Sequence, residues 1–255
     1  SINGYLKTIR NFMRYRADMG NQVYLPPFRK EKDLYIPYIF SDNELSEIFS
    51  IADAYPMVNP KSSIPYIHME IAFLLRLLYC CGLRLGEALE LQVCHLDLEN
   101  GVIRIINSKN KKQRLVPVHD TIKKMLIDYC RALEIYGTDD SFLFPGKDKH
   151  LSQITAERHF KTILKKAGII TGQEERHKRG PCLHCLRHRF MFSAFKKFEA
   201  AGYSVDMASP YLSVYCGHES LLESEKYMKF SSELFEKEVL RFSDFSEQLF
   251  PEVPI

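Results

Sequence analysis

The residues best suited to chemistry form a short basic stretch, His184-Cys185-Leu186-Arg187-His188. His184 and Arg187 are three residues apart, so a helix would place both on one face. A neutral imidazole can accept or donate a proton near neutral pH, and a guanidinium presents a planar fork that matches two phosphate oxygens. The stretch is therefore typical of a phosphate-binding site with acid–base capacity.

Other residues would complete a phosphoryl-transfer site around this basic stretch. Arg84 follows an apolar segment, and a second guanidinium would help to stabilise the extra charge of a pentacoordinate phosphorane. Glu87, three residues further on, is expected to orient the Arg84 side chain. His218 would donate another hydrogen bond to a phosphate oxygen. Tyr227, nine residues later, is the candidate nucleophile, because its phenol (ordinary pKa about 10) needs a nearby base and positive charge to attack phosphorus.

Basic side chains gather in two further places. Lys109, at the tip of a predicted hairpin, can either reach into a DNA groove and protonate a leaving 5′-oxygen or belong to a basic turn that only binds backbone phosphate. The side chains expected to contact DNA are Lys111, Lys112 and Arg114 in the hairpin, and Arg176, Lys178, Arg179 and His188 further on. Residues 102–118 and 176–189 each hold five Lys or Arg and no acid, whereas residues 219–255 hold nine acids and four bases (4 − 9 = −5). This segregation fits a surface that meets a polyanion, although solvated charge runs would look the same.

A zinc site is the main competing interpretation of the basic stretch. His177, Cys182, Cys185 and His188 include one Cys-x-x-Cys pair. A structural zinc site usually pairs two such doublets across a longer loop, and here Cys185 and His188 fall within one predicted helix. The sequence therefore favours a site without a bound metal ion.

Composition fits a folded protein that neither spans a membrane nor is secreted. The 255 residues are 45% apolar, enough for a proper core in one large domain or one domain plus a fragment. No apolar run reaches the roughly 18 residues that a membrane helix needs, and the start lacks a secretory signal. Seven irregularly spaced cysteines predict reduced thiols in a cytoplasmic protein.

Two parts are expected along the chain. Residues 6–15 predict a helix and 29–33 a charged linker, so residues 1–33 are interpreted as the trailing end of a preceding domain. The chain also lacks an initiator Met, so we expect it to be cut down from a longer one. Residues 34–255 would form the catalytic domain.

Helices dominate the expected catalytic domain, which makes it an α+β fold. Ser41 and Glu44 form a capping box, and a long apolar helix runs from Pro65 to a left-handed cap at Gly82. Residues 102–106 and 115–118 predict a β-hairpin, with a third strand at 95–98 completing a small antiparallel sheet. Further helices are expected at 120–136, 154–166, from 184, from 209 to Gly217, around Tyr227 and at 232–242.

These residues together resemble the tyrosine recombinase (phage integrase) family, including its Xer-type members. The matching pieces, in the family's order, are Cys81-Gly82-Leu83-Arg84-Leu85-Gly86-Glu87, the hairpin around Lys109, His184-x-x-Arg187-His188, and Gly217-His218 followed by Tyr227. The usual glycines beside the hairpin lysine are Ser108 and Asn110 here, so Lys111 or Lys112 could take its role. The resemblance covers about residues 34–245.

The resemblance implies a reaction and its partners. Tyr227 would form a 3′-phosphotyrosine on double-stranded DNA, with Arg84, Arg187 and His218 stabilising the phosphorane. His184 would be the general acid–base and Lys109 the acid for the leaving oxygen, with no metal or other cofactor. Residues 1–33 would be the remnant of a core-binding (SAM-like) DNA-binding domain, and the tail at 242–255 would dock onto a neighbouring protomer in a tetramer on two paired sites.

Two alternatives stay open at this point. A type IB topoisomerase would use the same chemistry to relax supercoils as a monomer. A DNA-binding regulator that lacks catalysis, with a zinc site, would belong to a different class. The sequence identifies neither the target site nor any accessory protein.

Overall fold

The computed structural model describes residues 2–28, 37–57, 64–106, 113–135, 140–147, 149–171 and 180–217. The chain divides into two compact units, Ser1–Ile36 and Pro37–Ile255. In the first unit, helix α1 (Ile2–Asp18) contains the helix predicted for residues 6–15 and leaves Tyr5, Phe12 and Tyr15 exposed. Within the described ranges, no helix is long and apolar enough to cross a membrane.

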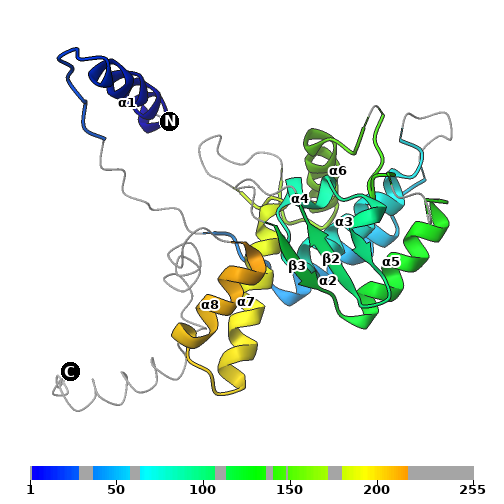
Figure 1. The fold of residues 1–255 in the computed structure, drawn as a ribbon. Coiled ribbons are helices and arrows are strands. Elements are labelled where there is room, and N and C mark those ends of the chain that lie inside the picture. Colours follow the sequence, from blue (N-terminus) through cyan, green and yellow to red (C-terminus); the bar gives the residue numbers. More distant parts are fainter. Residues whose placement is uncertain are drawn as a thin grey trace, which may run out of the picture. The chain divides into compact units, whose positions relative to one another are not determined.

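The second unit has the mainly helical α+β fold expected from the sequence (Figure 1). Its helices are α2 (Asp42–Asp53), α3 (Ile67–Cys81), α4 (Leu85–Leu89), α5 (Asp120–Ala132), α6 (Gln153–Lys166), α7 (His184–Ala200) and α8 (Val205–Cys216), with a 3₁₀ turn η1 (Val93–His95). Its strands are β1 (Leu96–Asp97), β2 (Val102–Ile105) and β3 (Arg114–Pro117).

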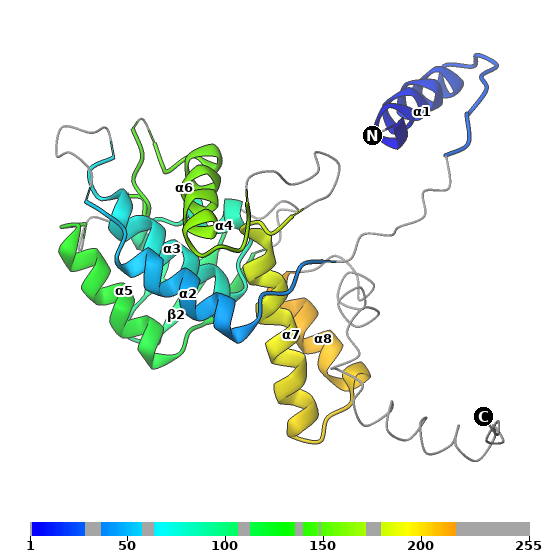
Figure 2. The same cartoon turned by 180° about the vertical axis from the view of Figure 1, so that it is seen from behind.

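The sheet is antiparallel with the strand order β1-β2-β3, and Ile103 pairs with Val116 across β2 and β3. Ile103 and Ile105 are buried while Arg104 between them is exposed, as the period of two in a strand requires. Pro117 lies on the edge strand, where a missing N–H costs no ladder bond. Figures 1 and 2 show the sheet on one side of the helices α2, α3 and α5.

Helix α3 forms the centre of the core. Most of its residues are buried, and apolar side chains lie on most of its faces instead of on a single one. Gly82 ends it in the left-handed conformation (φ 58°), as predicted. A Cβ at Gly82 would lie 2.4 Å from the ring of Phe190, so both the backbone angle and the close contact with α7 require glycine here.

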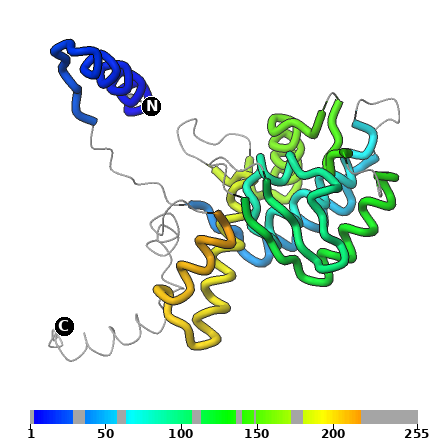
Figure 3. The backbone as a smooth tube through the Cα atoms, viewed as in Figure 1, coloured from blue at the N-terminus to red at the C-terminus, as the bar shows by residue number. Residues whose placement is uncertain are grey.

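Helices α7 and α8 form an antiparallel hairpin, whose reversal Figure 3 traces. Met191, Phe192 and Phe195 of α7 pack against Leu212 and Cys216 of α8 in a second, smaller core. This hairpin brings the C-terminal end of α8 back beside the N-terminal half of α7. Residues far apart in the chain can therefore share one site there.

The structure corrects one predicted helix start. Ser209 and Pro210 do not begin a helix, because α8 starts five residues earlier with Ser204 as its N-cap (209 − 204 = 5). The Ser204 side chain accepts a hydrogen bond from the backbone N–H of Met207, which makes it a complete cap. Pro210 therefore lies inside the helix and removes one backbone bond. The predicted Ser41–Glu44 capping box is confirmed in both directions.

A buried acid in α3 yields a test of the core. Glu70 is 1% exposed, its Oε2 atom has no hydrogen-bond partner among the described residues, and burial raises its pKa to about 8. The ordinary pKa of this carboxyl group is 4.5. Between pH 4.5 and about 8, the folded chain therefore keeps a proton on Glu70 that the unfolded chain releases. The free energy of unfolding should fall as pH rises through this window. We expect Glu70→Gln to raise the Tm at pH 8 relative to wild type by more than at pH 5.

The control for this comparison is Glu47→Gln, which changes an exposed acid on α2. Its Tm difference from wild type should be the same at both pH values. Equal Tm differences for Glu70→Gln at pH 5 and pH 8 would contradict a protonated buried carboxyl.

Candidate active site

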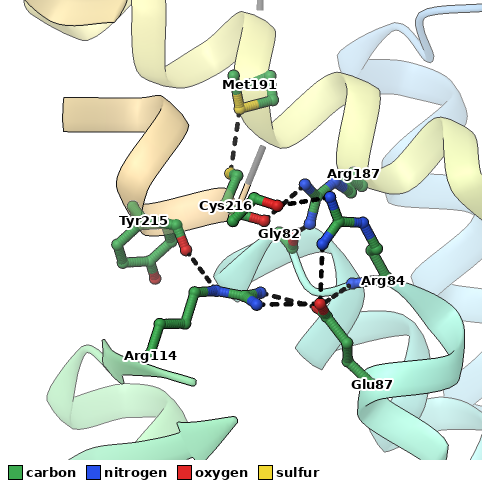
Figure 4. A network of polar contacts seen from close by, with 9 residues as sticks. Gly82, Arg84, Glu87, Arg114, Arg187, Met191, Tyr215 and Cys216 are labelled. Carbon is green, nitrogen blue, oxygen red and sulfur yellow. Dashed lines mark hydrogen bonds and ion pairs between the residues drawn. The ribbon is translucent and has the colours of Figure 1, made fainter. Parts of the chain in front are cut away.

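Three arginines from three elements hold the C-terminal turn of α8 (Figure 4). Arg114 of β3 donates from Nε to the Tyr215 carbonyl (2.8 Å), and Arg187 of α7 donates from Nη2 to the next carbonyl, that of Cys216 (2.8 Å). Arg84, the N-cap residue of α4, donates from Nη2 to the Gly217 carbonyl (2.6 Å). Carbonyls at a helix C-terminus lack intrahelical partners and carry the negative end of the helix dipole, so guanidinium groups suit them.

Glu87 of α4 links two of these arginines. Its carboxylate accepts two hydrogen bonds from the guanidinium of Arg114 (2.9 and 2.7 Å) and one from Nη1 of Arg84 (3.0 Å). The backbone N–H of Arg84 also donates to Glu87 Oε2 (3.0 Å). Burial alone would raise the pKa of Glu87, but these bonds outweigh it and lower the pKa. Glu87 is therefore an ionised, buried carboxylate that orients Arg84, as the spacing of the two residues suggested.

Arg187 is buried, with 1% of its surface exposed. Its guanidinium donates to the Gly82 carbonyl at the end of α3 as well as to Cys216 at the end of α8. Burying a charge is costly unless hydrogen bonds replace its hydration, and these carbonyls do so in part. Arg187, which the sequence analysis predicted to bind phosphate, thus connects the ends of α3 and α8.

Gly217 allows this convergence. It ends α8 in the left-handed conformation (φ 65°), and a Cβ there would lie 2.8 Å from Nη1 of Arg114. The sequence predicted that a helix ends at this glycine, and the left-handed backbone is one reason for glycine here. The close approach of Arg114 is a second reason, which only the tertiary structure reveals.

His184 begins α7 and is exposed to solvent, with its ring edge-on to that of His188 at 4.5 Å between centroids. Packing around the imidazole, and then the positive charges of Arg187 and Arg84, lower its pKa to about 4. His184 is therefore neutral at pH 7. A neutral imidazole can accept a proton.

Comparisons with known proteins identify the family. The model of the phage integrase family matches residues 40–230. This chain belongs to that family. A putative integrase/recombinase, y4rE, of Sinorhizobium fredii is 30% identical over 232 residues, which cover 89% of this chain and 71% of that protein. A tyrosine recombinase XerC of Thermodesulfovibrio yellowstonii is 28% identical, covering 72% of this chain and 59% of that one.

Solved structures share the fold of this integrase. XerA recombinase superposes with a TM-score of 0.57 at 21% identity and covers 97% of this chain and 75% of its own. The Tn1549 transposon integrase in complex with transposon right-end DNA gives a TM-score of 0.65 at 16% identity, covering 96% and 79%. The family and fold expected from the sequence are confirmed. The activity is site-specific recombination, in which DNA strands are cleaved and rejoined, and neither the topoisomerase nor the zinc-supported regulator is favoured.

Two residues expected to contact DNA have little exposed surface. The Arg114 side chain is 9% exposed, and its Nε and both Nη atoms donate to Tyr215 and Glu87. His188 is 5% exposed and lies beneath the surface of α7. Arg114 shares the inward face of β3 with buried Val116, two residues further on. The alternation of side chains along a strand could have indicated this inward position from the sequence.

The remaining expected site residues lie outside the described residues. They are Lys109, Lys111, Lys112, Arg176, Lys178, Arg179, His218 and Tyr227. His218 directly follows Gly217, the last described residue, so its backbone attachment point is the turn that the three arginines hold. Within the described part of the chain, no cluster of three or more His, Cys, Asp or Glu side chains is arranged to hold a metal ion. His177, one of the four zinc candidates, is not among the described residues.

The interpretation of Arg114 as a structural residue can be tested. Arg114→Ala leaves the buried carboxylate of Glu87 with one partner fewer, so we expect the free energy of unfolding to fall by about 3 kcal/mol. The salt dependence of DNA binding should stay unchanged, because no phosphate contact is lost. Chemical denaturation and binding titrations at several salt concentrations measure the two effects.

Arg104→Ala is the matched control, because Arg104 lies on the paired strand with its side chain 55% exposed. Its stability should stay within about 0.5 kcal/mol of wild type. If Arg114→Ala were stable and instead lowered the salt slope by about 0.9, Arg114 would be a DNA contact after all.

Proposed function

We propose that this integrase cleaves DNA with Tyr227, in a site assembled around the C-terminal turn of α8. The convergence of Arg84, Arg114 and Arg187 on three successive carbonyls is the observation that supports this most. It concentrates positive charge directly before His218. Tyr227 follows nine residues later, which is close enough along the chain to reach the same place.

In the proposed reaction, the Tyr227 oxygen attacks the scissile phosphorus and the bond to the 5′-oxygen breaks. The products are a 3′-phosphotyrosine and a 5′-hydroxyl. Arg84, Arg187 and His218 stabilise the charge on the phosphorane, and Lys109 gives its proton to the leaving 5′-oxygen. A 5′-hydroxyl of a partner duplex then reverses the step and joins the strands. The covalent link conserves the phosphodiester energy, so the scheme needs no metal or ATP.

His184 is proposed to take the proton from Tyr227. Its lowered pKa keeps the imidazole neutral in the free protein, so it is in the form that accepts a proton. An entering phosphate brings negative charge next to Arg84 and Arg187, which offsets their repulsion and raises the pKa of His184. The imidazole then becomes a stronger base when the substrate is bound.

The first unit is proposed to be the end of a core-binding, DNA-clamping domain. Helix α1 carries three exposed aromatic side chains and several basic ones, including Arg10 and Arg14. Exposed aromatic surface on a helix fits a segment that packs against neighbouring helices of a larger domain. Residues 34–255 would then be the catalytic domain proper, and residues 1–33 the remnant with its linker.

A suicide substrate tests the nucleophile. A nick beside the scissile phosphate lets the short 5′-hydroxyl fragment diffuse away, so the phosphotyrosine accumulates. We expect wild type to form a covalent protein–DNA adduct in EDTA, and Tyr227→Phe to form none. Arg84→Lys and Arg187→Lys should slow adduct formation by about 10²–10³, since a lysine cannot reproduce the planar fork. The adduct is measured by denaturing gel electrophoresis.

Tyr211→Phe serves as the control, because Tyr211 is an exposed tyrosine of α8 outside the site. It should form the adduct at the wild-type rate. An adduct that persists in Tyr227→Phe would overturn the assignment of the nucleophile. Unchanged melting temperatures of the lysine variants would separate slow chemistry from loss of folding.

Assembly into a tetramer is proposed to use the acidic, Phe-rich tail at residues 242–255. A pocket of about 370 Å³ lies between α3, the start of α5 and α7. Tyr79 and Phe190 line it, and Lys197 adds a positive charge. The tail segment carries three phenylalanines, three acids and no base, so its aromatic groups suit the apolar lining of this pocket and its charge suits Lys197. We therefore propose the pocket as the acceptor of a neighbouring protomer's tail.

Charge reversal at the pocket tests this pairing. We expect Lys197→Glu to reduce complexes of two paired DNA sites by at least about tenfold, because it repels the acidic tail. Binding to a single site should change less than twofold, since the pocket does not contact DNA in this proposal. Native gels on paired and single sites measure both. Lys161→Glu, on the exposed face of α6, is the control, and paired complexes of Lys197→Glu at the wild-type level would contradict this docking site.

A further inference from the structure

Two cysteines lie on either side of His184. The Sγ atoms of Cys182 and Cys185 are 3.6 Å apart, and the backbone N–H of Cys185 donates to the Cys182 carbonyl (2.9 Å). Cys182 is exposed, whereas Cys185 is fully buried in the main core. The proposed catalytic role of His184 involves neither thiol.

The two thiols differ in reactivity. A hydrogen bond from the Cys185 thiol lowers the pKa of Cys182 to about 6, helped by the backbone N–H groups of His184 and Cys185 and opposed by partial burial. The same bond, together with burial, raises the pKa of Cys185. An exposed thiolate beside a buried thiol is the combination that attacks an external disulfide and then closes an internal one.

The local geometry allows a disulfide. Its S–S bond measures about 2.05 Å, so the two sulfur atoms must approach by roughly 1.5 Å from their present separation. The pair spans one helical turn, and Cys182 precedes the first residue of α7, so its side chain can move without breaking an α7 backbone bond. Cys185 is fixed in the core, so most of the movement falls on Cys182 and on the segment that enters α7.

We propose that Cys182 and Cys185 are a redox-modification site, whose disulfide displaces His184 and slows strand cleavage. His184 lies between the two cysteines and Arg187 only two residues after Cys185, so tightening this turn moves the imidazole relative to the guanidinium. The slowing of cleavage rests on the role proposed above for His184. The formation of the disulfide does not depend on it.

The oxidant is a small-molecule disulfide of the glutathione type. The Cys182 thiolate attacks one of its sulfur atoms, forms a mixed disulfide and releases one thiolate. Cys185 then loses its proton, attacks Cys182 Sγ and releases the second thiolate. Both protons of the protein dithiol end on the released thiols, so one disulfide is reduced to two thiols while the protein loses two electrons. A dithiol reductant reverses the sequence.

Mass spectrometry tests the site without reference to activity. We expect wild type in oxidised glutathione buffer to lose the mass of two hydrogen atoms and to yield a peptide linked between Cys182 and Cys185, and Cys182→Ser to yield no such link. Cys94→Ser, which removes another exposed cysteine, should oxidise like wild type. Absence of the linked peptide in wild type, or one zinc ion per chain bound by these thiols in its place, would overturn the proposal.

The suicide substrate then tests the consequence. We expect oxidised wild type to form the adduct at least about tenfold more slowly than reduced wild type, and dithiothreitol to restore the rate. Cys182→Ser should react at the reduced wild-type rate, within about twofold, in either buffer. Adduct formation at an unchanged rate by protein with the proven disulfide would refute the effect on cleavage. If reduced wild type formed no adduct, the proposed function would fail while the mass result stood.

Discussion

The site depends on the unpaired carbonyls at the C-terminal end of α8. The last turn of a helix leaves backbone acceptors without intrahelical donors, and burying them unpaired would be costly. Here the carbonyls of residues 215, 216 and 217 each accept from a different arginine, supplied by β3, α7 and the start of α4. One requirement of the backbone thereby fixes three elements to each other. The same requirement fixes the point from which the chain continues to His218.

Electrostatics makes this arrangement suitable for a phosphate. Three guanidinium groups would repel one another strongly in a buried site, and the ionised carboxylate of Glu87 reduces that repulsion. The balance of these four side chains is still positive (3 − 1 = +2). Substrate phosphate would supply the missing negative charge. Burial lowers the pKa of His184 most, and the same positive surplus lowers it further, since nearby cations disfavour a protonated imidazole.

The first turn of α7 combines rigid and exposed positions. Cys185, Leu186 and Arg187 are buried and fix the helix to the core, whereas His184 faces solvent. An exposed side chain on a fixed backbone is the arrangement that the role proposed for His184 requires. The contact between Gly82 and the ring of Phe190 holds the other side of α7 against the end of α3.

The sequence by itself determined the family, the fold class and most of the helix and strand positions that the structure describes. Hydrophobic period, glycine caps at Gly82 and Gly217, and the Ser41–Glu44 capping box are local signals, and local physics is enough to read them. The predicted start of α8 was wrong because both Ser204 and Ser209 are residue types that suit an N-cap, and the structure uses Ser204. Only the tertiary structure decided that Arg114 bonds to Glu87 and Tyr215. The two partners of Arg114, Glu87 and Tyr215, lie 27 and 101 residues away in the chain. No local sequence pattern indicates which distant group will neutralise a buried charge.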